Sequence, residues 1–322
     1  MSISESFQYS VRNTLAYFDL VDFPLTKEDL FAYLWQPPQI TYAEFLSLLP
    51  VLQLPEKDGY YFLPGREEII QIRARRLLIS EKKLTIARRA ARLIRSVPFL
   101  KAIFVCNTVA TEQATTDSDI DFFIITAKNR IWITRLLITI ILQLFGLRRR
   151  KNKIKDKICL SFYVTEDNLD LSKLRVIDDD IHFAFWINQM LPLFDPQHYY
   201  PAFLQANAWT KKYLPHINPF SLSLYIDQVN ESRCSKIWKK VWEALWSKGY
   251  GDLINNEAKK IQLSKISRSQ SLLKSTKFSD NKSERNDKGV VISDTILKFH
   301  EKDTRLEYRQ RWQNRVAKII GI

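Results

Sequence analysis

The chain has 322 residues, of which 46% are hydrophobic and 26% are charged. This length and composition exclude a largely disordered protein and predict a globular one of about two domains. Lys and Arg number 49 against 35 Asp and Glu, a net charge of +14, so nucleic acids and other anions must be considered as partners. The three cysteines, Cys106, Cys159 and Cys234, are too few for a disulfide framework and lack metal-site spacing, which favours a reducing, cytoplasmic setting.

Residues 1–65 predict a winged-helix-like domain made of three short helices and a β-turn. Helices are expected over 8–20, over 27–35 after an N-cap at Thr26, and from Thr41, where Glu44 completes a capping-box pattern. The segment holds three basic and eight acidic side chains, and its third helix has no Lys or Arg. DNA binding is therefore possible but not favoured, and packing against a neighbouring domain or a protein partner is preferred.

Residues 66–97 predict a long connector helix with apolar positions at helical spacing. Ten basic and three acidic side chains lie between residues 66 and 100. The favoured interpretation is a solvated connector, and the alternative is a cationic wall that faces a phosphate-bearing ligand.

Residues 98–177 alternate between strand and helix patterns. The runs FLKAIFVCN, IDFFIIT and KICLSFYVT predict buried strands, and residues 129–147 predict an apolar helix. Arg135 and Gln143 interrupt that helix, which favours a core helix over a membrane span and gives no reason to expect a membrane partner. The pattern indicates an α+β fold with a mixed sheet.

The C-terminal half is expected to form three further segments. Residues 178–254 predict a helical domain in which Trp238, Trp242 and Trp246 share one helix face, typical of a core or a helix–helix seam. Residues 255–290, rich in Lys, Ser, Asn and Asp, predict a mobile basic linker. Residues 291–322 predict a strand followed by a charged helix.

The segment CNTVATEQATTDSDIDFFIIT, residues 106–126, carries the chemistry. Asp119 and Asp121 alternate with apolar residues at the start of a strand, so both carboxylates are expected on one face. Two neighbouring carboxylates repel unless a cation lies between them, which makes the pair a candidate site for Mg²⁺ or Mn²⁺. Such an ion bridges triphosphate oxygens and stabilises a departing pyrophosphate.

Ser118-Asp119-Ile120-Asp121 followed by FFIIT resembles the nucleotidyltransferase superfamily with the DNA polymerase β-like fold. More widely, LAYFDLVDFPLT, KICLSFYVTEDNL and ISDTILKFHEKDTR resemble a group of uncharacterised bacterial proteins that join a winged-helix segment to such a domain. The resemblance implies metal-dependent transfer of NMP, with AMP from ATP favoured, onto a hydroxyl of an unidentified acceptor (protein, RNA or small molecule). Asp119 and Asp121 would then be the catalytic metal ligands.

Candidate nucleotide contacts flank the two aspartates. Asn107 and Thr108 follow the first strand and, with Ser118, are expected to help hold the phosphates. Lys128 and Arg130, just past the second strand, are further candidate phosphate contacts, with solvated surface charge as the alternative. The basic run 148–157 either attracts an anionic acceptor or forms a solvated loop.

Two departures from the superfamily pattern keep a second function open. Asn107-Thr108 stands where the superfamily has Gly-Gly or Gly-Ser, and the third strand has no carboxylate, with Ser161 near the expected place. Asp156, Glu166 and Asp167 lie only at the two ends of that strand. The alternative is a catalytically weakened nucleotide-binding or regulatory protein whose winged helix contacts a protein or DNA partner.

Overall fold

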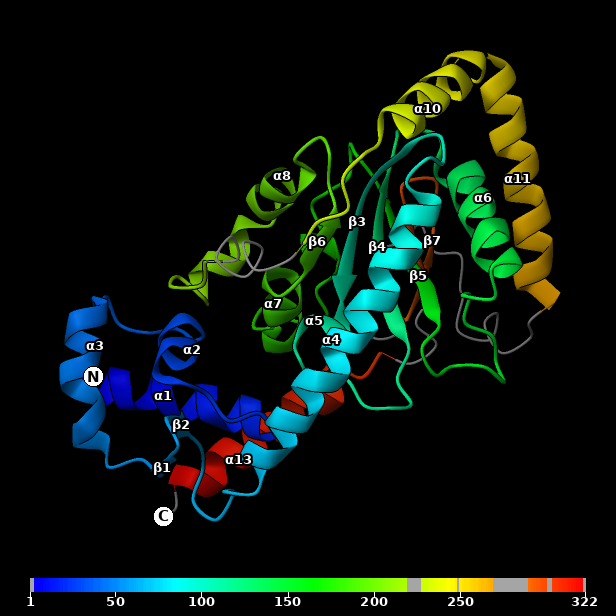
Figure 1. Ribbon diagram of the computed structural model, residues 1–322. Coiled ribbons are helices and arrows are strands. Elements are labelled where there is room, and N and C mark those ends of the chain that lie inside the picture. Colours follow the sequence, from blue (N-terminus) through cyan, green and yellow to red (C-terminus); the bar gives the residue numbers. More distant parts are fainter. Residues whose placement is uncertain (1–2, 219–226, 248, 269–288, 300–302, 321–322) are drawn as a thin grey trace.

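A computed structural model describes residues 3–218, 227–247, 249–268, 289–299 and 303–320. These residues form an α+β protein around a six-stranded mixed sheet (Figure 1). The strand order is β6-β3-β4-β5-β8-β7, and only the β4–β5 pair is parallel. The mixed sheet predicted for the centre of the chain is therefore confirmed.

The sheet is built from segments far apart in the sequence. Its strands are β3 (Leu100–Cys106), β4 (Ile120–Thr126), β5 (Ile158–Thr165), β6 (Leu191–Phe194), β7 (Val290–Ile292) and β8 (Ile296–Phe299). The segment 178–254, predicted to be entirely helical, thus contributes β6, whose short apolar run LPLF pairs with β3. The predicted C-terminal strand is a β7–β8 hairpin that extends the sheet beside β5.

Helices cover both faces of the sheet because its strands alternate apolar side chains between the two faces. One face packs against α4 (Ile69–Ile94) and α6 (Ile131–Leu144), and α11 (Gly249–Arg268) lies on α6. The other face packs against α7 (Ile181–Asn188) and α8 (Tyr199–Ala206). Figure 1 shows α4 running along the molecule from the N-terminal helices to the far end of the sheet.

The N-terminal elements follow the predicted pattern. They are α1 (Ile3–Asp19), α2 (Lys27–Ala32), α3 (Tyr42–Leu48), the 3₁₀ turn η1 (Leu49–Leu52) and the hairpin of β1 (Glu56–Lys57) and β2 (Tyr60–Tyr61). Both caps form, since the side chains of Thr26 and Thr41 accept backbone N–H groups in complete capping boxes. Their core also includes Phe185 of α7 and Trp312 of α13 (Arg305–Ile320), so these elements pack against the rest of the chain.

Helix α11 corrects the predicted linker over 255–290. The helix continues to Arg268 because Asn255, Ala258 and Gln262 lie on one face, at helical spacing, and are buried against α6. Residues 269–288 of that predicted linker lie outside the described residues. The remaining short elements are α5 (Asn107–Ala110), η2 (Ser172–Leu174), η3 (Ala208–Lys212) and α10 (Arg233–Leu245).

Helix α6 is the apolar helix predicted near residues 129–147, and it is a core helix. Trp132, Ile138 and Leu142 are fully buried in the main hydrophobic cluster. No described helix has the length and apolar character needed to cross a membrane.

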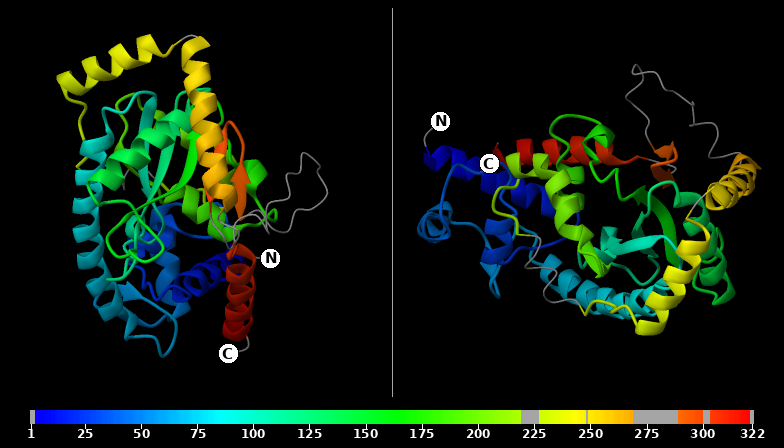
Figure 2. Two further views of the ribbon diagram at one scale, coloured as in Figure 1. Left: turned by 90° about the vertical axis from the view of Figure 1, so that its right-hand side faces the viewer. Right: turned by 90° about the horizontal axis from the view of Figure 1, so that it is seen from above.

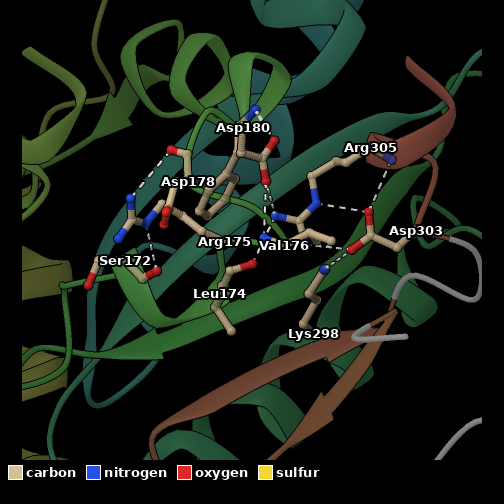
Figure 3. A network of polar contacts seen from close by, with 10 residues as sticks. Ser172, Leu174, Arg175, Val176, Asp178, Asp180, Lys298, Asp303 and Arg305 are labelled. Carbon is tan, nitrogen blue, oxygen red and sulfur yellow. Dashed lines mark hydrogen bonds and ion pairs between the residues drawn. The ribbon is translucent and has the colours of Figure 1, made fainter. Parts of the chain in front are cut away.

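A buried charge network ties the C-terminal helix to the sheet (Figure 3). The Arg305 guanidinium donates to Asp180 Oδ2 at 2.9 Å and to both oxygens of Asp303 at 2.8 and 2.6 Å. Lys298 Nζ on β8 lies 3.1 Å from Asp303 Oδ2. Burial alone would raise the pKa of Asp303, but Arg305 and Lys298 together hold that pKa well below its ordinary value. The network therefore joins α7, β8 and α13 through ionised groups.

Replacing Arg305 by Met should lower the free energy of unfolding by about 3–5 kcal/mol, because Asp180 would stay buried without a cation and Asp303 would keep only Lys298. Urea unfolding measures the loss, and Lys318→Met, at an exposed position of α13, is the control, expected within about 0.5 kcal/mol of wild type. Equal losses in the two variants would contradict the assignment of Arg305 as the anchor of α13.

Candidate functional site

Asp119 and Asp121 lie together at the start of β4, on the sheet face that α7 and α8 cover. Asp119 directly precedes the strand, and Asp121 is its second residue. One oxygen from each carboxylate and the sulfur of Cys159 all lie within 4.8 Å of one another. Asp121 is only 8% exposed. The predicted pairing of the two carboxylates on one face is thus present in the structure.

The third member of this group is a thiol rather than a carboxylate. The parallel register of β4 and β5 places Cys159 beside Asp121 and Phe162 beside Phe123, so β5 has one extra residue between these pairs. A bulge of this kind turns side chains away from simple alternation. It explains why Cys159, and not Ser161 as the sequence suggested, joins the pair. Burial raises the pKa of the Cys159 thiol, which stays neutral beside the carboxylates.

Among the described residues, no carboxylate completes the pair. Asp156 Oδ1 instead lies 2.6 Å from Lys83 Nζ, before β5 begins. Glu166 and Asp167 lie past the other end of β5, where Glu166 Oε1 accepts the Lys128 N–H and Asp167 pairs with the Lys128 ammonium at 3.2 Å. Each of the three carboxylates offered by the sequence is therefore committed elsewhere.

Arg149 supplies a positive charge at the site that sequence reasoning did not assign. Its Nη1 donates to Asp119 Oδ2 at 2.6 Å and lies 3.5 Å from Cys159 Sγ. The Arg149 backbone N–H donates to Ile158 O at 2.9 Å, which fixes this residue alongside the start of β5. Arg149 belongs to the basic run 148–157, so that run reaches the site through one guanidinium.

The electrostatics of the pair favour a bound cation. Burial, and next the neighbouring Asp119 charge, raise the pKa of Asp121, while contacts with Asn107, Cys159 and Arg149 oppose the rise. Two carboxylate oxygens fit Mg²⁺ or Mn²⁺, with phosphate oxygens and water completing the shell. A cysteine sulfur suits softer ions such as Zn²⁺ better. The donor set therefore fits a divalent cation held by Asp119 and Asp121 and leaves Cys159 as a poor ligand for Mg²⁺.

Asn107 is the first residue of α5 and directly follows β3. Its φ is 57°, in the left-handed region that Asn enters more readily than most residues. Trp186 Nε1 of α7 donates to Asn107 Oδ1 at 2.7 Å and fixes that side chain. Thr108, the next residue, is exposed. The turn thus keeps the backbone conformation that a glycine would provide, and it presents a hydroxyl beside the carboxylates' strand.

Lys83 of α4 positions the loop that leads into Asp119. Its ammonium donates to Ser118 O at 2.8 Å, to Thr116 O at 3.3 Å and to Asp156 Oδ1 at 2.6 Å, although the residue is 1% exposed. Ser118 Oγ donates to Thr115 O at 2.9 Å, so this hydroxyl also stabilises the loop. α4 is therefore not simply a solvated connector. The available sequence signal was a lysine on the otherwise small and apolar stripe formed by Ser80, Lys83, Ala87, Ala90 and Ile94.

Lys128 and Arg130 do not join the site. Both follow the C-terminal end of β4, and a seven-residue strand separates them from Asp119 by roughly 20 Å. Arg130 is buried, pairs with Asp252 and donates to Trp246 O at 3.1 Å. These two side chains therefore lie at the opposite end of β4 from Asp119, because the length of the strand, invisible in a local motif, separates them.

Comparison with known proteins gives no further guidance, since no family model, no curated protein and no solved structure matches the chain. The function must be argued from the geometry of the Asp119–Asp121 site.

Lys83→Met should lower the free energy of unfolding by about 1–3 kcal/mol, because three oxygen acceptors lose a buried donor. The matched control is Lys82→Met, which changes an exposed neighbour on the same helix and should leave stability within about 0.5 kcal/mol. Chemical unfolding of both variants provides the measurement, and an unchanged Lys83→Met protein would rule out the positioning role.

Proposed function

We propose that the chain is a metal-dependent nucleotidyltransferase that moves NMP from an NTP, with ATP the favoured donor, to a hydroxyl acceptor. The observation that carries the proposal is the pair of the half-buried Asp119 and the buried Asp121 at the start of a central strand, beside Asn107 and Thr108. The fold class, an α+β protein with a mixed sheet, is compatible with a polymerase β-like domain.

The residues divide the work as follows. Asp119 and Asp121 hold a divalent cation, which when bound neutralises triphosphate oxygens and the departing pyrophosphate. Thr108, together with the backbone of its turn, contacts phosphate. Without a bound cation, the Arg149 guanidinium balances the negative charge of the carboxylates. Because its side chain is 43% exposed, it can turn toward phosphate when a cation binds Asp119. Lys83 keeps the loop before Asp119 in place.

Asp121→Asn should weaken metal-dependent ATP binding by about 100-fold, because it removes a charged ligand but keeps the side-chain shape. The control is Asp117→Asn, an exposed neighbour in the same loop, which should bind as wild type does. Equilibrium dialysis with labelled ATP and Mn²⁺ measures binding. Similar affinity in Asp121→Asn and wild type would sink the proposal.

A second candidate function is nucleotide binding without transfer. It is favoured by Cys159, whose neutral thiol stands where a third carboxylate would hold a second cation or take the acceptor proton. In that case the chain would act as a nucleotide sensor that communicates through its N-terminal helices, with a protein partner favoured over DNA.

Cys159→Asp distinguishes the two candidates. If the chain only binds nucleotide, wild type releases no pyrophosphate with ATP, metal and cell extract, and the new carboxylate raises release above background. If the chain is a transferase that works with two carboxylates, wild type already releases pyrophosphate and Asp119→Ala does not. No metal-dependent ATP binding by wild type would exclude both.

A further inference from the structure

Helix α10 presents its apolar side chains to solvent at one end of the molecule. Ile237 is 64% exposed and Leu245 is 60% exposed. Trp238 is more than half exposed, and Val241 is half exposed. Tyr250 and Leu253 at the start of α11 are exposed as well. The left view of Figure 2 shows α10 at one end of the molecule, next to the start of α11. We call the exposed side of α10 formed by Ile237, Trp238, Val241 and Leu245 the α10 face.

The orientation of α10 is fixed by polar groups that point inward. Lys239 is buried, with its Nζ 3.6 Å from Glu231 and above the Phe194 ring. Glu243 Oε1 accepts the Phe99 N–H at 2.7 Å. Rolling the helix to bury its apolar side would break these contacts and expose the sheet edge they cover. The predicted burial of Trp238 in a seam is therefore wrong, although Trp246 does pack against the core.

The exposed charges of α10 itself have one sign, and Asp252 at the start of α11 is exposed but pairs with Arg130. The exposed charged side chains of α10 are Arg233, Lys236 and Lys240. Both acidic groups of this segment, Glu231 and Glu243, are turned inward by the contacts above. A shallow hollow of about 410 Å³ lies beside α10, and Arg92, Arg95 and Trp238 are among the residues that line it. The two arginines lie at the end of α4. The surface thus combines an apolar centre with a cationic border.

This combination selects the partner. Two copies of the face would bring basic borders together with no exposed acid on α10 to pair them, so self-association is disfavoured. Nucleic acid would match the charge but would leave the aliphatic centre without a complement. An anionic bilayer satisfies both, because Trp, Tyr and Leu enter the headgroup–acyl boundary while Lys and Arg contact lipid phosphates.

We propose that the α10 face docks the protein onto the surface of anionic lipid membranes, with Arg92, Arg95, Lys236 and Lys240 contacting headgroup phosphates. The helix would lie in the plane of the interface and would not span the bilayer. This departs from the expectation of no membrane partner, which rested on the lack of a spanning segment, whereas a helix of thirteen residues can bind in the interface without spanning. Docking leaves the Asp119–Asp121 site at the opposite end of β4 and does not depend on the function proposed for it.

Co-sedimentation of the full chain with vesicles tests the proposal. Wild type should bind vesicles that contain phosphatidylglycerol, bind poorly to pure phosphatidylcholine, and dissociate as salt rises. Val241→Glu should reduce binding at least about tenfold, and Lys236→Ala and Lys240→Ala should each reduce it about fivefold. The control is Leu78→Glu, at an exposed apolar position of α4 outside the face, which should bind as wild type does.

The alternative outcomes are decisive. Equal binding to both lipids would remove the role of the basic border, and equal loss in Val241→Glu and Leu78→Glu would remove the role of the α10 face. If the wild type binds no vesicles and instead forms a concentration-dependent dimer that Val241→Glu abolishes, the α10 face is a self-association surface and the membrane proposal is overturned. Ile237→Ser, a milder change, should reduce vesicle binding without altering the unfolding midpoint, which separates loss of docking from loss of structure.

Discussion

The organisation of the site depends on two carboxylates that one strand holds on the same buried face. Asp119 and Asp121 repel each other, and the low exposure of Asp121 strengthens that repulsion. The contacts around them relieve it: Arg149 pairs with Asp119, and Cys159 contributes a neutral thiol where a third negative charge would be costly. The pair therefore persists with a guanidinium, and a divalent cation is the natural competitor for its place.

Local patterns predicted much of the fold, and long-range contacts account for the errors. The strand over 120–126 and both capping boxes follow from side chains close in sequence. Arg149 and Lys83 reach the site from 30 and 35 residues away from Asp119 and Ser118, across helices that no local motif describes. The bulge that brings in Cys159 depends on how β4 and β5 align, which the sequence of β5 alone does not specify.

For helix α10, the sequence predicted the wrong orientation of an apolar face. The tryptophans at every fourth position correctly predicted one helix face, but the direction of that face was set by Lys239 and Glu243, whose partners lie on other elements. The N-terminal helices do not account for the net charge of +14. Part of the positive charge borders the α10 face, and Arg149 balances the carboxylates.

The proposed competition between Arg149 and a divalent cation can be tested directly with Mn²⁺. Electron paramagnetic resonance of the full chain with Mn²⁺ and a non-hydrolysable ATP analogue should give about one bound ion per chain, with coupling to phosphorus. In the absence of nucleotide, Arg149→Ala should bind the ion more tightly than wild type, and Asp119→Asn should lose it with or without nucleotide. An unbound Mn²⁺ spectrum in wild type, or a bound spectrum that Asp119→Asn leaves unchanged, would contradict a metal–nucleotide site at these carboxylates.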